Sequence, residues 1–265
     1  MLRAIVVSLV LLLAPVPARA QAGAIVVVGG GNTGPEIVSK TLALAGGKGV
    51  AIVAVLPQSS AEPDAGVDSV KMWLAAGAKD AAIVRFEDHA AARASLERAT
   101  LIWMPGGDQN RFMKAIEGTG LDDVIRARVR AGTTAGGTSA GAAVLAAEMF
   151  TGDADLKSLT AGATVTAKGL GLLPGILIDQ HFLTRQRDNR LISAVFDHPS
   201  LLGVGIDEST AIVVRGGAFE VIGKSSVVVI DARHAAVDKV PAGQHISGTG
   251  VTLSVLHAGQ SFSLR

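Results

Sequence analysis

Short apolar runs alternate with more polar segments along most of the chain. Each run is a nearly continuous stretch of Val, Ile, Leu and Ala, which is typical of strands in a parallel sheet covered on both faces. Strands are therefore expected at Ile25–Val28, Val50–Leu56, Ala81–Phe86, Leu101–Met104, Ile176–Ile178 and Leu202–Ile206. The segments between them predict helices at Asp68–Ala76, His89–Ala99, Gln109–Ile116, Leu121–Arg130 and Arg190–Phe196. This alternation predicts an α/β fold with a mostly parallel central sheet.

The pattern changes after residue 210, where strands become short and glycine-containing turns separate them. The expected strands are Ala211–Arg215, Phe219–Ile222, Ser226–Ile230 and Val251–Leu256. Closely spaced strands of this kind favour antiparallel pairing, so we expect a C-terminal antiparallel β extension at one edge of the sheet. The chain shows no internal repeat and no low-complexity linker, and residues 21–265 are interpreted as a single domain.

The first twenty residues resemble a secretory signal peptide. A single Arg3 precedes the apolar run Ala4–Ala14, and the small-residue site Ala18-Arg19-Ala20 follows two prolines. This layout predicts cleavage after Ala20 and a secreted or periplasmic protein. The alternative is a membrane anchor, but a run of 11 residues is short of the roughly 20 needed to cross a bilayer. We therefore expect no stable membrane insertion.

The composition narrows the class of partner. The chain has 265 residues, of which 49% are hydrophobic, enough for one substantial core. Lys and Arg total 24 against 23 Asp and Glu, so no basic field draws nucleic acid. Tyr is absent and aromatic residues are only 3%, which leaves few platforms for stacking bases or sugars. A small molecule or a peptide is the expected partner, and the absence of cysteine excludes a thiol nucleophile.

The strongest local signal is Gly137-x-Ser139-x-Gly141, which matches the turn that exposes a nucleophilic serine between a strand and a helix. Small residues are needed there because the turn brings neighbouring backbone close. The N–H of Ala140 would lie at a helix N-terminus, where it can stabilise an oxyanion. The run Ala143–Ala147 is interpreted as a buried helix. The structural alternative is a serine that merely caps this helix.

A base and an acid for Ser139 are expected at the ends of two other strands. His181 follows Ile176–Ile178, and strand ends are where crevices form in open α/β sheets. The other five histidines lie in polar helical or turn contexts and are interpreted as surface residues. Glu208 follows Leu202–Ile206 and would fix the imidazole tautomer. Its neighbour Asp207 competes, and only one of the two can face His181.

A glycine-rich segment after the first strand formally matches a dinucleotide-binding fingerprint, with glycines at 29, 31 and 34. Such a site also needs an acid after the second strand, where this chain has Val55-Leu56-Pro57-Gln58. The loop is therefore expected to let substrate backbone approach the crevice. Neither a cofactor nor a metal is predicted, because His-x-x-x-His spacing is also absent.

Four motifs together resemble the cyanophycinase branch of the peptidase E family. The motifs are Gly136–Ala142, the segment Asp179-Gln180-His181-Phe182-x-x-Arg185-x-Arg187-x-x-Arg190, the loop Pro105–Gln109 and the segment Gly205–Glu208. The resemblance implies the three-layer, flavodoxin-like fold of class I glutamine amidotransferases. It also implies hydrolysis of cyanophycin, a polyaspartate carrying arginine in isopeptide linkage, to β-aspartyl-arginine.

Carried over residue by residue, the resemblance implies a triad of Ser139, His181 and Glu208, with Gly107 as the second oxyanion donor beside Ala140. It places Gln109, Asp179, Gln180, Arg185, Arg187 and Arg190 in the substrate pocket, with Arg185 in the turn before a helix. An aspartyl dipeptidase sharing the triad is the alternative activity, and a catalytically silent binding protein is the alternative class. Relatives in this family are commonly dimers, so the resemblance favours a homodimer.

Overall fold

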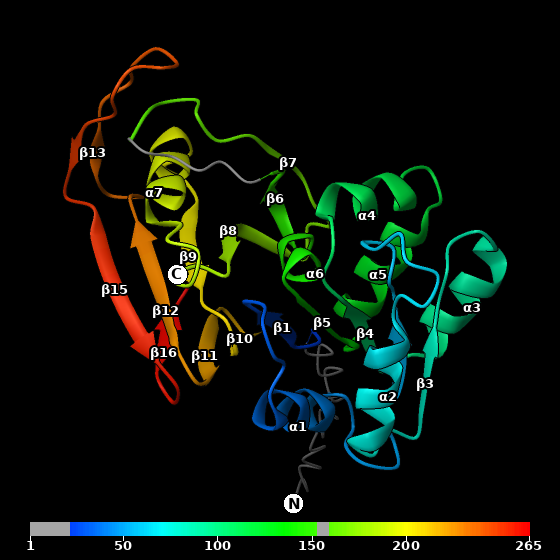
Figure 1. Ribbon diagram of the computed structural model, residues 1–265. Coiled ribbons are helices and arrows are strands. Elements are labelled where there is room, and N and C mark those ends of the chain that lie inside the picture. Colours follow the sequence, from blue (N-terminus) through cyan, green and yellow to red (C-terminus); the bar gives the residue numbers. More distant parts are fainter. Residues whose placement is uncertain (1–21, 153–158) are drawn as a thin grey trace, which may run out of the picture.

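The computed structural model describes residues 22–152 and 159–265, and it builds them into two large sheets with helices around them (Figure 1). The predicted signal peptide, residues 1–20, lies outside the described residues and stays a prediction. None of the described helices is long and apolar enough to cross a membrane.

The first sheet contains a run of five parallel strands. These are β1 (Ile25–Val28), β2 (Ile52–Val55), β3 (Asp80–Ile83), β4 (Leu101–Met104) and β5 (Thr134–Thr138). Three antiparallel strands extend it, namely β10 (Thr210–Arg215), β11 (Ala218–Gly223) and β16 (Ser261–Ser263). Among the described residues the order is β16-β11-β10-β1-β5-β4-β2-β3. Strand β1 therefore lies between β5 and β10, where it joins the parallel and antiparallel parts.

Helices cover both faces of the first sheet because its strands are apolar on both sides. Helices α1 (Pro35–Leu44) and α2 (Val67–Ala75) pack with Val26 and Val28 on one face. Helices α3 (His89–Arg98), α4 (Gln109–Ile116) and α5 (Leu121–Arg130) pack with Ile25 and Val27 on the other. These layers confirm the expected α/β fold with a mostly parallel central sheet.

The second sheet packs against the same core as α3, α4 and α5. Its strands are β6 (Ala146–Phe150), β7 (Thr166–Lys168), β8 (Leu173–Gln180), β9 (Leu202–Ile206), β12 (Ser226–Asp231) and β15 (Thr252–His257), in the order β15-β12-β9-β8-β6-β7. Helix α7 (Asp188–Asp197) covers its outer face through Leu191, Ala194 and Val195. A small hairpin joins β13 (Ala236–Val237) and β14 (Gly248–Thr249).

Three details differ from the sequence predictions. The expected helix over Ala143–Ala147 is wrong: α6 spans only Ala140–Ala143, and β6 begins at Ala146 and pairs with β8. A fully buried apolar run carries no periodicity that separates helix from strand, so neighbouring β8 decides. The C-terminal strands are antiparallel as expected, but they extend both sheets rather than one edge. Strands β8 and β9, which the sequence suggested for the central sheet, belong to the second sheet.

Candidate active site

Ser139 occupies a tight turn between β5 and α6. Its backbone is left-handed, with φ of 54°, and its N–H donates to the carbonyl of Val28 at 3.1 Å. The flanking glycines have no room for a side chain. A Cβ on Gly137 would lie 2.2 Å from the oxygen of Gly141, and a Cβ on Gly141 would lie 1.9 Å from the oxygen of Met104. The steric argument made for this turn from the sequence therefore holds in the structure.

His181 lies directly beside Ser139, although 42 residues separate them in the chain. Its Nε2 is 2.8 Å from the hydroxyl oxygen of Ser139, and its Nδ1 is 2.6 Å from Oε1 of Glu208. Since a carboxylate only accepts hydrogen bonds, the Nδ1–H donates to Glu208 and leaves Nε2 free to accept from the serine. The His181 side chain is 10% exposed and that of Glu208 is 34% exposed. The three side chains thus form one continuous relay, with the acid nearer to solvent.

Asp207, the competing acid, points to the other side of the strand end. Its carboxylate accepts hydrogen bonds from the N–H and hydroxyl of Thr184, both at 2.9 Å, and from the hydroxyl of Ser225 at 2.7 Å. Burial raises the pKa of the Asp207 carboxyl, but the hydrogen bonds from Thr184 and Ser225 outweigh it, so its pKa lies below the ordinary value of 3.8. Asp207 therefore fastens the turn that follows His181, and Glu208 is the acid in the relay.

Replacing Asp207 by asparagine should lower the free energy of unfolding by about 1–3 kcal/mol at neutral pH, because the amide nitrogen that replaces one carboxylate oxygen cannot accept the hydrogen bonds made to that oxygen and the charge of the other acceptor is lost. Since the folded-state pKa is below 3.8, the stabilisation by the ionised carboxylate is present above that value. It is lost as the pH falls through the folded-state pKa. Denaturant unfolding of both proteins at neutral pH and at about pH 3 measures this. A stability difference that does not narrow in acid would contradict the assignment.

The loop between β4 and α4 lies against the serine turn. A Cβ built on Gly106 would be 3.3 Å from the Cβ of Ser139 and 3.8 Å from its hydroxyl oxygen. Gly107 has φ of 137° and packs against the backbone of Ser59, whose carbonyl accepts from Asp108 at 2.8 Å. The N–H of Ala140, the first residue of α6, has no acceptor within its own helix. Ala140 thus directly follows the serine, and the loop that carries Gly107 contacts the serine through Gly106; the two N–H groups stay predicted oxyanion donors.

Three of the predicted pocket residues lie on segments that border the relay. Gln109 begins α4, and its amide nitrogen donates to the carbonyl of Phe150 at 2.9 Å. Gln180 ends β8 next to His181, and its buried side-chain oxygen has no hydrogen-bond partner among the described residues. Arg185 is exposed in the turn before α7, and its N–H donates to the carbonyl of His181 at 2.9 Å. The expected place of Arg185 in the turn before a helix is confirmed.

The other three predicted pocket residues form a buried ionic cluster. The carboxylate of Asp179 is fully buried and is paired with Arg190 through both oxygens, with Nε to Oδ2 at 2.9 Å. Arg187 lies 3.6 Å from the same carboxylate and donates to the carbonyl of Gln180 at 2.7 Å. The guanidinium of Arg190 also lies 4.6 Å from the ring centre of Phe150. These contacts tie α7 to the end of β8, two residues before His181.

The glycine-rich segment after β1 borders the relay. A Cβ on Gly30 would overlap the imidazole of His181, and one on Gly31 would lie 2.9 Å from the Oε2 of Glu208. The side chains that approach this loop are therefore those of the relay. The glycine spacing predicted a close approach to this loop by substrate backbone, which stays a prediction, and it did not predict the approach of His181 and Glu208. Nothing local in the sequence pointed to Thr184 and Ser225.

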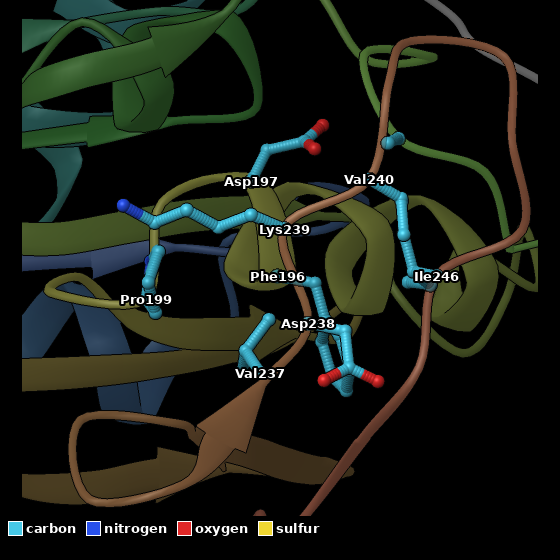
Figure 2. Close-up of a pocket in the computed structure, with 9 residues that line it drawn as sticks. Phe196, Asp197, Pro199, Val237, Asp238, Lys239, Val240 and Ile246 are labelled. Atoms are coloured by element: carbon cyan, nitrogen blue, oxygen red, sulfur yellow. The ribbon is translucent and has the colours of Figure 1, made fainter.

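Outside the relay, the described residues contain fewer groups arranged to bind a ligand or to react. No group of three or more His, Asp or Glu residues with metal-ligand geometry occurs within residues 22–152 and 159–265. A cavity of about 220 Å³ lies at the C-terminal end of α7, opposite the end that follows His181 (Figure 2). Its two carboxylates come from Asp197 on α7 and from Asp238 after β13, and they already accept hydrogen bonds from Gly162 and Ser247. This cavity contains none of the relay residues.

A serine hydroxyl, an imidazole and a carboxylate in hydrogen-bond contact at the strand ends of an α/β fold are arranged as in serine-type hydrolases. A family model described as Peptidase family S51 matches residues 25–222, from β1 through most of β11, and includes all three relay residues. The chain belongs to peptidase family S51 and is a serine-type peptidase.

Two relatives support this assignment, and one solved structure shares the fold. A protein named cyanophycinase from Geminocystis herdmanii is 36% identical over 253 residues, which cover 90% of this chain and 93% of the relative. One of the same name from Trichormus variabilis is 35% identical over 260 residues, covering 93% and 87%. The crystal structure of a peptidase from an acI-B1 actinobacterium has a TM-score of 0.65 at 20% identity, covering 92% of this chain and 98% of that one. This last similarity concerns the fold alone.

Proposed function

We propose that the protein hydrolyses cyanophycin and releases β-aspartyl-arginine dipeptides, using Ser139 as nucleophile, His181 as general base and acid, and Glu208 as the orienting carboxylate. The observation that carries the proposal is the unbroken relay from Ser139 through His181 to Glu208, with contacts of 2.8 and 2.6 Å. The substrate is suggested by the relatives named cyanophycinase, which match along nearly the whole chain.

In the proposed mechanism, the hydroxyl oxygen of Ser139 attacks a backbone carbonyl of the polyaspartate while Nε2 of His181 takes its proton. The oxyanion that forms is stabilised, in this proposal, by the N–H groups of Gly107 and Ala140. The leaving amine then receives the proton from His181. Water next attacks the acyl-enzyme while His181 takes its proton, and transfer of that proton to the oxygen of Ser139 releases the acyl group. Glu208 stabilises the imidazolium that exists between these proton transfers.

The exposed and the buried pocket residues are proposed to have different roles in substrate binding. A substrate unit carries a guanidinium and a free carboxylate, so it needs both acceptors and donors. Arg185, exposed in the turn after His181, is the proposed donor to the carboxylate. Gln180 is buried, so it is assigned to the pocket wall rather than to direct contact with substrate. The carboxylate of Asp179 is already paired with Arg190 and Arg187, and these three residues are proposed to hold the pocket wall in place.

The direct test is to incubate the protein with cyanophycin and to identify the products by mass spectrometry, with short aspartyl peptides as parallel substrates. Release of β-aspartyl-arginine is the expected result. Cleavage of the short peptides without release from the polymer would overturn the substrate and support the aspartyl dipeptidase alternative. If neither substrate is cleaved by a folded protein, the proposed activity itself fails.

Replacing Arg185 by alanine should raise KM for the polymer about 10-fold or more and leave kcat within a few-fold, because it removes a charge-assisted hydrogen bond to bound substrate. The matched control is Arg98→Ala. Arg98 is also exposed, but it ends α3 just before β4 begins, at the edge of the sheet opposite the relay. Steady-state kinetics on cyanophycin measures both variants. Equal KM values for the two would show that Arg185 does not contact the substrate.

A further inference from the structure

Three consecutive backbone carbonyls at the end of β1 bind the three segments that carry the relay. The carbonyl of Val28 accepts from the N–H of Ser139 at 3.1 Å, that of Gly29 from His181 at 2.6 Å, and that of Gly30 from Ser209 at 2.9 Å. Ser209 directly follows Glu208. One short stretch of chain thus fixes the backbone of the nucleophile and of the base, and of the residue next to the acid.

The three donating residues share an uncommon positive φ. Ser139, His181 and Ser209 have φ of 54°, 52° and 53°, in the left-handed region that residues with a Cβ seldom adopt. Conformations of this kind persist where the surrounding structure determines them, and they concentrate at active sites. Here the surrounding structure is the row of three carbonyls. Each carbonyl would lose its donor if the residue bonded to it moved to an ordinary negative φ.

The same stretch presents a surface without side chains to the relay. A Cβ on Gly30 would lie 2.2 Å from Cε1 of His181 and 2.4 Å from its Nε2, well inside van der Waals contact. A Cβ on Gly31 would lie 2.9 Å from both the Cβ and the Oε2 of Glu208. The imidazole therefore rests on the backbone of Gly30, and the carboxylate rests on that of Gly31.

We infer that Val28–Gly31, which we call the glycine platform, positions the relay, and that Gly30 and Gly31 are positioning residues for His181 and Glu208. This inference rests on the proposed function, since it concerns the reaction of Ser139. The physical reason is that the imidazole has hydrogen bonds at both ends. Any lateral shift that a methyl group forces on the ring lengthens the bond to Ser139 and the bond to Glu208 together. A misplacement of about 1 Å commonly costs about 100-fold in rate.

The test compares Gly30→Ala and Gly31→Ala with two control variants. Gly118→Ala introduces a methyl group after the C-terminal end of α4, where nothing lies within 4 Å, and its φ of 72° is close to the 65° of Gly31. Gly46→Ala reproduces the backbone strain of Gly30, since its φ is 106° against 104°, but it lies beside Val50, away from the relay. These controls separate displacement of the relay from strain and from the methyl group itself.

The readouts are kcat and KM on the cleaved substrate and the rate at which a fluorophosphonate probe modifies Ser139. For Gly30→Ala and Gly31→Ala we expect kcat and the modification rate to fall about 100-fold or more, with KM within about 3-fold of wild type. Thermal unfolding of Gly30→Ala should match that of Gly46→Ala within a few degrees. Rates equal to those of the controls would overturn the inference.

Two further measurements keep the outcome decisive. If Gly30→Ala fails to fold, Gly31→Ala still tests the platform, because it displaces the partly exposed Glu208 and leaves the imidazole contact unchanged. Its pH profile of kcat/KM should shift relative to Gly118→Ala, since the acid governs the ionisation of the base. An unchanged profile would contradict the inference. Failure of the proposed function is recognised separately, because the probe would then not modify Ser139 in the wild type.

Discussion

Replacing Ser139 by alanine is expected to lower kcat on cyanophycin by about 10⁴-fold or more while the protein remains folded. The hydroxyl oxygen of Ser139 is the atom proposed to bond to substrate, and His181 and Glu208 act through it, so no other relay residue can replace it. The left-handed backbone at Ser139 suits alanine no worse than serine, because the two differ only by the hydroxyl group. Binding of substrate should therefore be retained with KM within a few-fold.

The measurement is product release followed by mass spectrometry, with unfolding curves of both proteins recorded in parallel. Ser39→Ala is the matched control, since Ser39 lies exposed on α1, on the face of the sheet that α1 and α2 cover. It should have wild-type rates. Substantial turnover by Ser139→Ala with a normal unfolding curve would remove Ser139 from the mechanism and leave the relay without a nucleophile.

Replacing Arg190 by methionine is expected to lower the free energy of unfolding by about 3–5 kcal/mol, the largest stability effect that we expect from a single change here. Arg190 is 2% exposed, and its partner Asp179 is fully buried. Removing the guanidinium leaves the carboxylate of Asp179 without its two-point partner and the carbonyl of Gly152 without a donor at 2.8 Å. Arg187, at 3.6 Å from Asp179, supplies partial compensation.

Denaturant unfolding measures this change, and Arg185→Ala is the control because Arg185 is exposed on the adjoining turn. The double variant Arg190→Met with Asp179→Leu should recover part of the loss, since replacing both members of a buried ion pair by apolar groups of similar volume is often neutral. A loss below about 1 kcal/mol for Arg190→Met would place the pair with ordinary surface ion pairs. The ionic cluster would then not be what secures α7 to β8.

The proposed site joins the two sheets of the fold. Ser139 comes from the end of β5 in the first sheet, whereas His181 and Glu208 follow β8 and β9 in the second. The glycine platform at the end of β1 contacts both groups. A loss of packing between the sheets should therefore affect the relay before it affects either sheet, because no single sheet contains all three side chains.

Much of this arrangement could be predicted from the sequence because it depends on local chemistry. Strands β1, β4 and β9 have the bounds that their apolar runs predict, and Gly137 is needed because Gly141 follows only four residues later. Gly141, in contrast, is needed because Met104 on β4 lies against it. The position of His181 at a strand end also follows from the chain alone. The choice between Asp207 and Glu208 does not, because both lie at the same strand end and differ only in the side they face.

Only the tertiary structure decided the contacts between residues far apart in the chain. The relay bonds join residues 42 and 27 positions apart, and the partners of Asp207, Arg190 and Gly30 come from other elements. From the sequence alone, an arginine in a polar segment is predicted to be exposed or to bind substrate, because its buried partner is not known. A glycine motif likewise predicts that another group packs closely against the backbone, but it does not identify that group. The sequence by itself determined the turn, the strands and the types of reacting group, since these depend on near neighbours; the packing of two sheets determined which groups meet.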